Sequence, residues 1–226
     1  MSAGPTLQPW NALILAAGAG TRMGHVPKGL IRVDGAPLIA RLVSALLACE
    51  ATHALTGIVV VLGHHAAALR AALPEPADPR LHTLVLDTPA EQADSLRAGL
   101  ARLDTLPAAQ ATLVCLTDQP GIDAGAIDAL HAAWTRRPDG IDMLVPVVNG
   151  TPGNPVMLGS TVGADLLAAP TPQTGRDWRK LHPGRVLAWP APHAAFTLDL
   201  DTREDVQRLV AQGWRIDLPE STGPTD

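Results

Sequence analysis

The chain has 226 residues, of which 46% are hydrophobic and only 3% aromatic, so it is long enough for one α/β domain with a mainly aliphatic core. Its formal net charge of −5 argues against a nucleic-acid-binding surface. No apolar stretch approaches the roughly 18 residues of a membrane span. We therefore expect no nucleic-acid partner and no membrane partner.

The two ends of the chain differ in composition from its centre. Residues 1–10 lack the basic start and apolar centre of a signal peptide and are predicted to be a loose leader. Residues 214–226 are predicted to be a polar tail, which leaves a single domain over residues 11–213. The two cysteines, Cys49 and Cys115, match no metal or redox spacing. A cytoplasmic location is the simplest interpretation.

The most distinctive stretch covers residues 12–30, ALILAAGAGTRMGHVPKGL. It begins with an apolar run bounded by glycine, which predicts a buried parallel strand. Gly18 and Gly20 then allow backbone N–H groups to approach an anion, and Arg22 and Lys28 add positive charge. The loop therefore predicts a cradle for a polyphosphate.

Two common glycine loops do not fit this stretch. A dinucleotide-binding fingerprint requires a third glycine where Met23 stands. A P-loop requires lysine after its last glycine, but His25 follows Gly24.

Strands and helices are expected to alternate along the chain. We expect strands over residues 12–17, 30–33, 58–62, 81–86, 112–116, 141–148, 155–158, 186–189 and 196–200, and helices over 37–49, 66–73, 90–103, 123–136, 160–167, 175–181 and 202–212. Asp123 and Ser160 are the expected N-caps of two of these helices. The alternation predicts a three-layer α/β/α, Rossmann-like fold with a mainly parallel sheet, in which ligands bind beyond the carboxyl ends of the strands.

Carboxylates follow two of the expected strands. Asp118 comes just after the strand over 112–116, where it can serve as a ligand for the Mg²⁺ that accompanies a nucleoside triphosphate. The alternative is that Asp118 caps the next turn. Asp199 and Asp201 alternate along the last strand and so face one side, although Asp201 can instead cap the helix near Thr202.

Two further stretches carry candidate contacts. Gln92 and Ser95 lie at the start of a predicted helix, where free N–H groups attract anions, although Ser95 can also be an ordinary surface hydroxyl. Gly153, Asn154 and Pro155 form a predicted turn between strands, which needs no function by itself.

Taken together, these stretches resemble the MobA-like NTP transferases. The pattern L-A-A-G-x-x-x-R-M-G-x-x-x-K matches at Leu15, Ala16, Ala17, Gly18, Arg22, Met23, Gly24 and Lys28. The stretches Asp118-Gln-Pro, Gly153-Asn-Pro-Val and Asp199-Leu-Asp-Thr fit the same family. The resemblance implies a fold of the nucleotide-diphospho-sugar transferase type.

The resemblance also implies a role for each candidate residue. Arg22, Lys28 and Asp118 would be catalytic, and Asp118 with Asp201 or Asp199 would bind Mg²⁺. Gly153, Asn154 and Pro155 would face the acceptor. The nucleotide would contact Leu15, Ala16, Ala17, Gly18, Gly20, Arg22, Lys28, Gln92, Ser95 and Asp118. One departure is Glu91, which stands where the family has glycine in a G-x-S-x-S-L stretch.

Within the family, the motifs are most similar to those of the molybdenum cofactor cytidylyltransferases. The implied reaction moves CMP from CTP to a phosphorylated acceptor, molybdopterin first, and releases pyrophosphate; a molybdoenzyme is then a candidate receiver of the product. The sequence Lys28-Gly29-Leu30 is shared with the related guanylyltransferases, so GTP and other phosphorylated acceptors stay open.

Two functions of a different class also stay open, an oxidoreductase with a nucleotide cofactor and a non-catalytic nucleotide-binding protein. The failed dinucleotide fingerprint counts against the first. The two carboxylate sites count against both, because simple binding does not require them.

Overall fold

A computed structural model describes residues 8–87 and 91–219. The strands are β1 (Trp10–Ala16), β2 (Arg32–Val33), β3 (Ala36–Pro37), β4 (Leu55–Leu62), β5 (Leu81–Val85), β6 (Ala111–Leu116), β7 (Met143–Val148), β8 (Thr151–Pro152), β9 (Val156–Gly159), β10 (Val186–Pro190) and β11 (Ile216–Asp217). The α-helices are α1 (Leu38–Ala48), α2 (Ala66–Ala71), α3 (Gln92–Leu103), α4 (Ala124–Thr135), α5 (Ser160–Ala168), α6 (Gly175–Leu181) and α7 (Arg203–Ala211). Of the described helices, none is long and apolar enough to cross a membrane.

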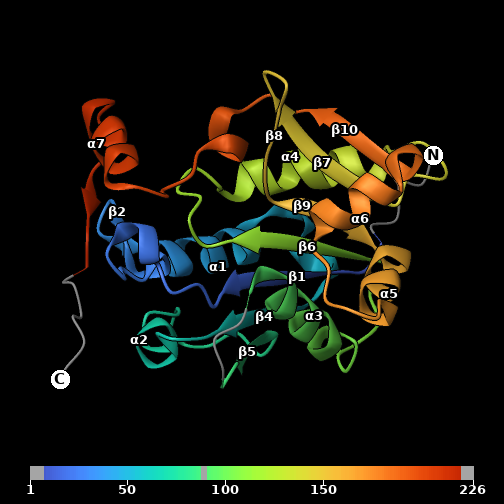
Figure 1. Ribbon diagram of the computed structural model, residues 1–226, viewed down its shortest axis with the longest axis horizontal. Coiled ribbons are helices and arrows are strands. Elements are labelled where there is room, and N and C mark those ends of the chain that lie inside the picture. The colour runs from blue at the N-terminus through green and yellow to red at the C-terminus, as the bar shows by residue number, and fades with distance from the viewer. Residues whose placement is uncertain (1–7, 88–90, 220–226) are drawn as a thin grey trace.

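The main sheet is mostly parallel, as predicted. Its strand order is β10-β7-β9-β6-β1-β4-β5, with β8 paired to β7 (Figure 1). Only β9 runs against the neighbours on both of its sides. A second, small sheet contains β11, β2 and β3.

Helices cover both faces of the main sheet, so the molecule has three layers (Figure 1). Because side chains of a strand alternate between faces, β1 contributes to both cores. Ala12 and Ile14 pack with residues of α1 and α4, whereas Leu13 and Leu15 pack with residues of α3, α5 and α6. This double burial explains why the first strand is an unbroken apolar run.

The order of the strands defines where a ligand can bind. The chain passes from β1 through β4 to β5 on one side, and β6 then returns to the other side of β1. The carboxyl ends of β1 and β6 are therefore neighbours, with Leu15 opposite Leu116 in the parallel register. Such a switch in direction is the usual ligand site of an open α/β sheet.

One predicted strand is wrong. Residues 196–200 join no strand, and a 3₁₀ helix, η5, covers Ala194–Thr197 instead. Phe196 is fully buried there against Trp189, with their ring centroids 5.6 Å apart. The apolar side chain of Phe196 thus packs against Trp189 of β10, and the segment does not pair with a strand.

Other predicted boundaries move for local reasons. The expected strand over 30–33 shrinks to β2, because Lys28–Leu30 form a 3₁₀ helix, η2. Asp123 is confirmed as an N-cap, since its carboxylate accepts a hydrogen bond of 2.8 Å from the Ala126 N–H. Ser160 is not a cap: α5 begins at Ser160 itself, after Gly159.

Residues expected outside the core at both ends belong to it. Trp10 is 1% exposed, and its indole N–H donates to the Ala51 carbonyl at 2.9 Å. Near the other end, Trp214 and Ile216 pack against a separate small core that also contains Met23 and Leu209. Residues 1–7 and 220–226 of the predicted leader and tail lie outside the described residues.

The burial of Trp10 gives a test of this boundary. Trp10→Ala removes a buried aromatic side chain and should lower the free energy of unfolding by about 3–5 kcal/mol. Urea unfolding followed by circular dichroism measures the change. Gln8→Ala, at an exposed position two residues earlier, is the control and should change little. Equal stability of the two variants would show that Trp10 belongs to a loose leader after all.

Candidate functional site

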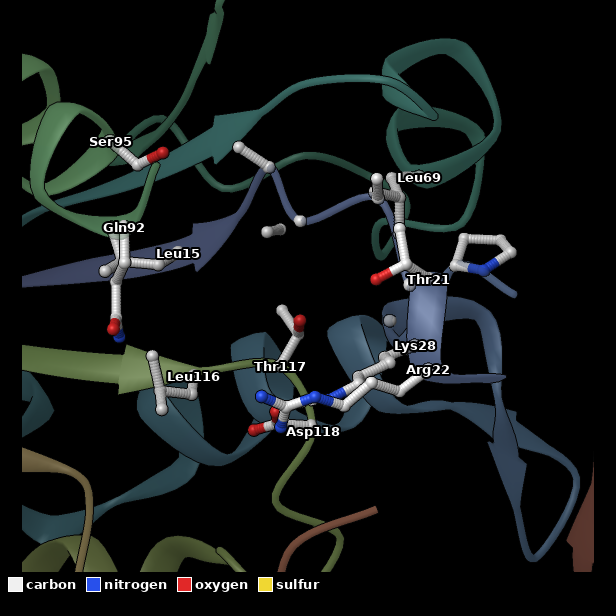
Figure 2. A pocket seen from close by; sticks show the side chains of 17 residues that line it. Leu15, Thr21, Arg22, Lys28, Leu69, Gln92, Ser95, Leu116, Thr117 and Asp118 are labelled. Atoms are coloured by element: carbon white, nitrogen blue, oxygen red, sulfur yellow. Dashed lines mark hydrogen bonds and ion pairs between the residues drawn. The ribbon is translucent and has the colours of Figure 1, made fainter. Parts of the chain in front are cut away.

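A cavity of about 430 Å³ opens at the carboxyl ends of β1 and β6 (Figure 2). Every residue predicted to contact a nucleotide lines it: Leu15, Ala16, Ala17, Gly18, Gly20, Arg22, Lys28, Gln92, Ser95 and Asp118. The sequence motifs therefore converge on one site although they are far apart along the chain.

The glycine loop forms one wall of this cavity. Gly20 has a φ of +63°, and a Cβ at this position would lie 2.0 Å from the Val26 carbonyl oxygen, so only glycine fits. The Met23 and His25 N–H groups both donate to the Gly20 carbonyl and fix the turn. The N–H groups of residues 18–20 donate to no other described residue. They remain available to an anion.

The start of α3 forms the opposite wall, where Gln92 and Ser95 lie (Figure 2). Ser95 is only 3% exposed, so it is not an ordinary surface hydroxyl. Glu91, the departure from the family pattern, precedes the helix, and its N–H donates to the Asp94 carboxylate at 3.1 Å. The helix start is thus well formed without the expected glycine.

Lys28 joins two carboxylates that are distant in sequence. Its ammonium donates to Asp118 Oδ2 at 3.0 Å and to Asp201 Oδ1. Burial of the ammonium acts to lower the pKa of Lys28, but the charges and hydrogen bonds of Asp118 and Asp201 outweigh burial and raise it. Lys28 is thus held as a cation between the two residues that the sequence proposes as metal ligands.

Asp201 and Asp199 differ in their surroundings. Asp201 does not cap α7, because Thr202 is the N-cap and its side chain accepts a hydrogen bond from the Asp205 N–H. Asp201 Oδ2 lies instead 3.6 Å from Arg22 Nη1. Asp199 is half-buried, and burial together with the nearby charges of Asp118 and Asp201 raises its pKa to about 6.

The carboxylates have unused acceptor capacity. Asp118 Oδ1 and Asp199 Oδ1 are buried and accept no hydrogen bond from a described residue. Unpaired carboxylate oxygens are the donors that Mg²⁺ takes, so these residues fit a divalent cation. In the present arrangement Lys28 supplies the positive charge, and the described residues contain no group of three or more His, Cys, Asp or Glu placed to hold a metal.

A second cavity, of about 580 Å³, adjoins the first and shares Leu15, Gln92, Leu116 and Asp118 with it. Among the residues expected to face an acceptor, Gly153 and Asn154 line the second cavity. Pro155 is buried and is not among the described residues that line it.

Gln119 lies within the Asp118-Gln-Pro stretch, but the sequence analysis assigned it no role. In the structure it fixes the loop beside this cavity. Its side-chain amide is 6% exposed and donates to the Asn154 and Phe196 carbonyls, each at 3.0 Å. Only glycine fits at position 153, because a Cβ there would lie 2.1 Å from the Phe196 carbonyl oxygen. Gln119 therefore positions both the Asn154 turn and the segment that leads to Asp199.

Other lining residues were also missed. Thr117 and Leu69 line the first cavity, and Arg176, Arg179 and Lys180 line the second. One signal was present in the sequence, since Lys28 and Lys180 are the only lysines of the chain and both line a cavity.

Comparisons with known proteins identify a family and a fold. A family described as the MobA-like NTP transferase domain matches residues 12–186. The bifunctional protein GlmU of Paraburkholderia xenovorans is 36% identical over 121 residues, which are 53% of this chain and 24% of that protein. The chain thus spans about a quarter of the length of this curated relative.

Solved structures show the same fold. Rv0371c from Mycobacterium tuberculosis H37Rv is 25% identical, with a TM-score of 0.68 over 91% of this chain and 99% of that one. That protein has also been solved in complex with manganese, where the TM-score is 0.65 at 24% identity. A nucleotidyl transferase from Methanothermobacter has a TM-score of 0.71 at 20% identity, over 90% of this chain and 97% of that one.

The position of Lys28 predicts an unusual response to cations. Lys28→Met leaves Asp118 and Asp201 without their shared ammonium and should lower the free energy of unfolding in EDTA by about 1–3 kcal/mol. Because a divalent cation can replace the lost charge, Mg²⁺ should restore more stability to the variant than to the unsubstituted protein. Thermal unfolding with and without Mg²⁺ measures both effects.

The control for this comparison is Arg136→Met, which removes an exposed cation at the end of α4. It should change neither the stability in EDTA nor the response to Mg²⁺. If Lys28→Met behaves like this control, the ammonium does not neutralise the two carboxylates.

Proposed function

The chain belongs to the MobA-like NTP transferase domain family, and from this we propose that it transfers a nucleoside monophosphate from a nucleoside triphosphate to a phosphorylated acceptor. CTP is the proposed donor and molybdopterin the proposed acceptor, with pyrophosphate as the second product. The observation that carries the proposal is the meeting of the two cavities at Asp118, with the glycine loop on one side and the Asn154 turn on the other.

The reaction needs two anions to approach each other. An oxygen of the acceptor phosphate attacks the α-phosphorus of CTP, and the bond from that phosphorus to the oxygen bridging to the β-phosphate breaks. Pyrophosphate leaves with the bonding electron pair. Because the attacking phosphate is already anionic, no strong general base is required, and positioning and charge neutralisation carry the rate.

Different residues of the first cavity position the nucleotide and neutralise its charge. The N–H groups of residues 18–20 and the exposed Arg22 guanidinium hold the triphosphate. Ser95 and Gln92 contact the nucleoside end of the cavity. Asp118 and Asp201, with Asp199 beside them, would hold Mg²⁺, which would supply positive charge to neutralise the phosphates. The manganese complex of Rv0371c agrees with a divalent cation.

Lys28 changes partners in this proposal. Without nucleotide its ammonium neutralises Asp118 and Asp201. If those carboxylates held a divalent cation instead, the ammonium would be free to contact the phosphates, where a charge-assisted hydrogen bond is worth roughly 1.5–3 kcal/mol.

The choice of CTP and of a cofactor acceptor rests on the motifs. The Ala16-Ala17-Gly18 form, Asp118-Gln-Pro and Asp199-Leu-Asp-Thr are similar to those of the molybdenum cofactor cytidylyltransferases. A molybdoenzyme is the proposed receiver of the product. The proposed location is the cytoplasm, which agrees with the two buried free thiols, Cys49 and Cys115.

The donor nucleotide is tested by a screen of four nucleoside triphosphates, each with Mg²⁺ and either molybdopterin or a sugar 1-phosphate, in which released pyrophosphate is measured. CTP with molybdopterin should give the highest rate. A higher rate with GTP would show that Lys28-Gly29-Leu30 is the better guide to the base. Tight nucleotide binding without pyrophosphate release from any pair would indicate a binding protein instead.

The metal ligand is tested by Asp118→Asn, which keeps the shape of the side chain and removes its charge. Turnover should fall by about a hundredfold or more, because the cation loses a ligand at the junction of the cavities. The exposed Asp139→Asn is the matched control. Turnover of Asp118→Asn within a factor of two of the control would remove Asp118 from the catalytic set.

A further inference from the structure

The second cavity is a trough over one face of the sheet. Its floor consists of apolar side chains from β6, β7 and β9: Val114, Leu116, Met143, Val145, Val156 and Leu158. Leu96 and Gln92 of α3 line one side, and residues of α6 line the other. In Figure 1, β6 is visible between these two helices.

Two parts of the wall of this trough carry opposite charge. Asp118, Asp199 and Asp201 lie at the carboxyl end of the sheet. On α6, three cations line the same cavity, namely Arg176, Arg179 and Lys180. Their spacing of three and four residues places them on one side of the helix.

The three cations have no partner among the described residues. None of them lies within 4.0 Å of a described carboxylate, whereas nearby Arg185 is 2.8 Å from Asp142 and 3.8 Å from Asp165. Asp177 lies on the same helix, but its carboxylate accepts hydrogen bonds from the Thr174 hydroxyl at 2.6 Å and the Thr174 N–H at 3.0 Å. The wall therefore keeps an excess of positive charge toward the cavity.

The helix that presents these cations is firmly held. Trp178 is 1% exposed and donates its indole N–H to Asp165 at 3.0 Å. Its ring stacks on His182 with a centroid distance of 4.3 Å, and the Arg185 guanidinium lies 5.1 Å from it. The cations of α6 are therefore preorganised, which lowers the entropy cost of binding a ligand.

A nucleoside triphosphate does not account for this wall. The phosphates have the glycine loop and Arg22, and no residue of α6 is among the described residues that line the first cavity. An acceptor with a single phosphate does not account for it either, because that phosphate must lie at the carboxylate end to react. The α6 wall then still presents three cations with no anion to bind.

We propose that Arg176, Arg179 and Lys180 bind a second anionic group of the acceptor, across an apolar body from its reacting phosphate. The acceptor class is thus a phosphorylated molecule with two separated anions, the second being a phosphate, a carboxylate or a thiolate. This assignment rests on the proposed function, because it takes the second cavity as the acceptor site.

Two matched probes test the second anion. Glucose 1-phosphate and glucose 1,6-bisphosphate differ only in the phosphate far from carbon 1. Their binding is measured by titration calorimetry to protein saturated with α,β-methylene CTP and Mg²⁺, which fills the first cavity. The bisphosphate should bind about tenfold more tightly or better, as expected for charge-assisted hydrogen bonds.

The variants locate the effect on α6. The double substitution Arg179→Gln with Lys180→Gln should reduce the preference for the bisphosphate to about threefold or less, and Arg136→Gln on α4 should leave it unchanged. Equal binding of the two phosphates to the unsubstituted protein, including no binding of either, overturns the proposal. So does an unchanged preference in the double variant, which is also the outcome expected if α6 serves as a docking surface for an acidic protein.

A failure of the proposed function is separable from a failure of this inference. Titration of α,β-methylene CTP alone tests the nucleotide site, and the double variant should bind it as the unsubstituted protein does. With any acceptor that turns over, the double variant should raise the KM for the acceptor about tenfold and leave the KM for CTP unchanged. A fall in kcat with no change in the acceptor KM contradicts a binding role for α6.

Discussion

The ion pairs of Lys28 with Asp118 and Asp201 connect three segments that are 90 and 173 residues apart in sequence. One follows β1, one follows β6 and one precedes α7. The sheet brings the ends of β1 and β6 together, and the Leu200 N–H donates to the Asp118 carbonyl at 2.9 Å, which holds the third segment beside them. The pairs in turn neutralise carboxylates that would otherwise repel each other in a half-buried site, where charge is poorly screened. The fold and the charges of the site therefore depend on one another.

In this arrangement the Lys28 ammonium occupies the place where we propose that a divalent metal binds. Asp118 Oδ1 and Asp199 Oδ1 still lack hydrogen-bond partners among the described residues, so the ammonium satisfies only part of the acceptor capacity. An ammonium offers three donors from one point, whereas Mg²⁺ takes several oxygen ligands around it. Under the proposed function, a divalent cation would replace the ammonium at these carboxylates. The same exchange would turn Lys28 from a partner of carboxylates into a partner of phosphates.

The sequence predicted those site residues that directly follow a buried strand. The apolar run before Gly18 and the carboxylate after residues 112–116 both follow from rules on buried strands and their ends. The strand predicted over 196–200 is wrong because Phe196 lies in η5 and is buried against Trp189, so its apolar character reflects packing and not strand pairing. The cations of α6 were not recognised because only the tertiary arrangement shows that Asp142 and Asp165 pair with Arg185 and leave Arg176, Arg179 and Lys180 without partners.

The reversed direction of β9 explains why the Asn154 turn lies beside Asp118. In a purely parallel sheet, the residues before a strand lie at the opposite edge from the residues after its neighbours. Because β9 is antiparallel to β6, with Val156 opposite Val114, its beginning lies at the edge where β6 ends. Asn154 is therefore close to Gln119, which follows Asp118 directly. The hydrogen bonds that the Gln119 side-chain amide donates to the Asn154 and Phe196 carbonyls hold the turn in place. The reversed β9 thus brings the Asn154 turn to the edge that already holds the glycine loop, and the two cavities meet there at Asp118.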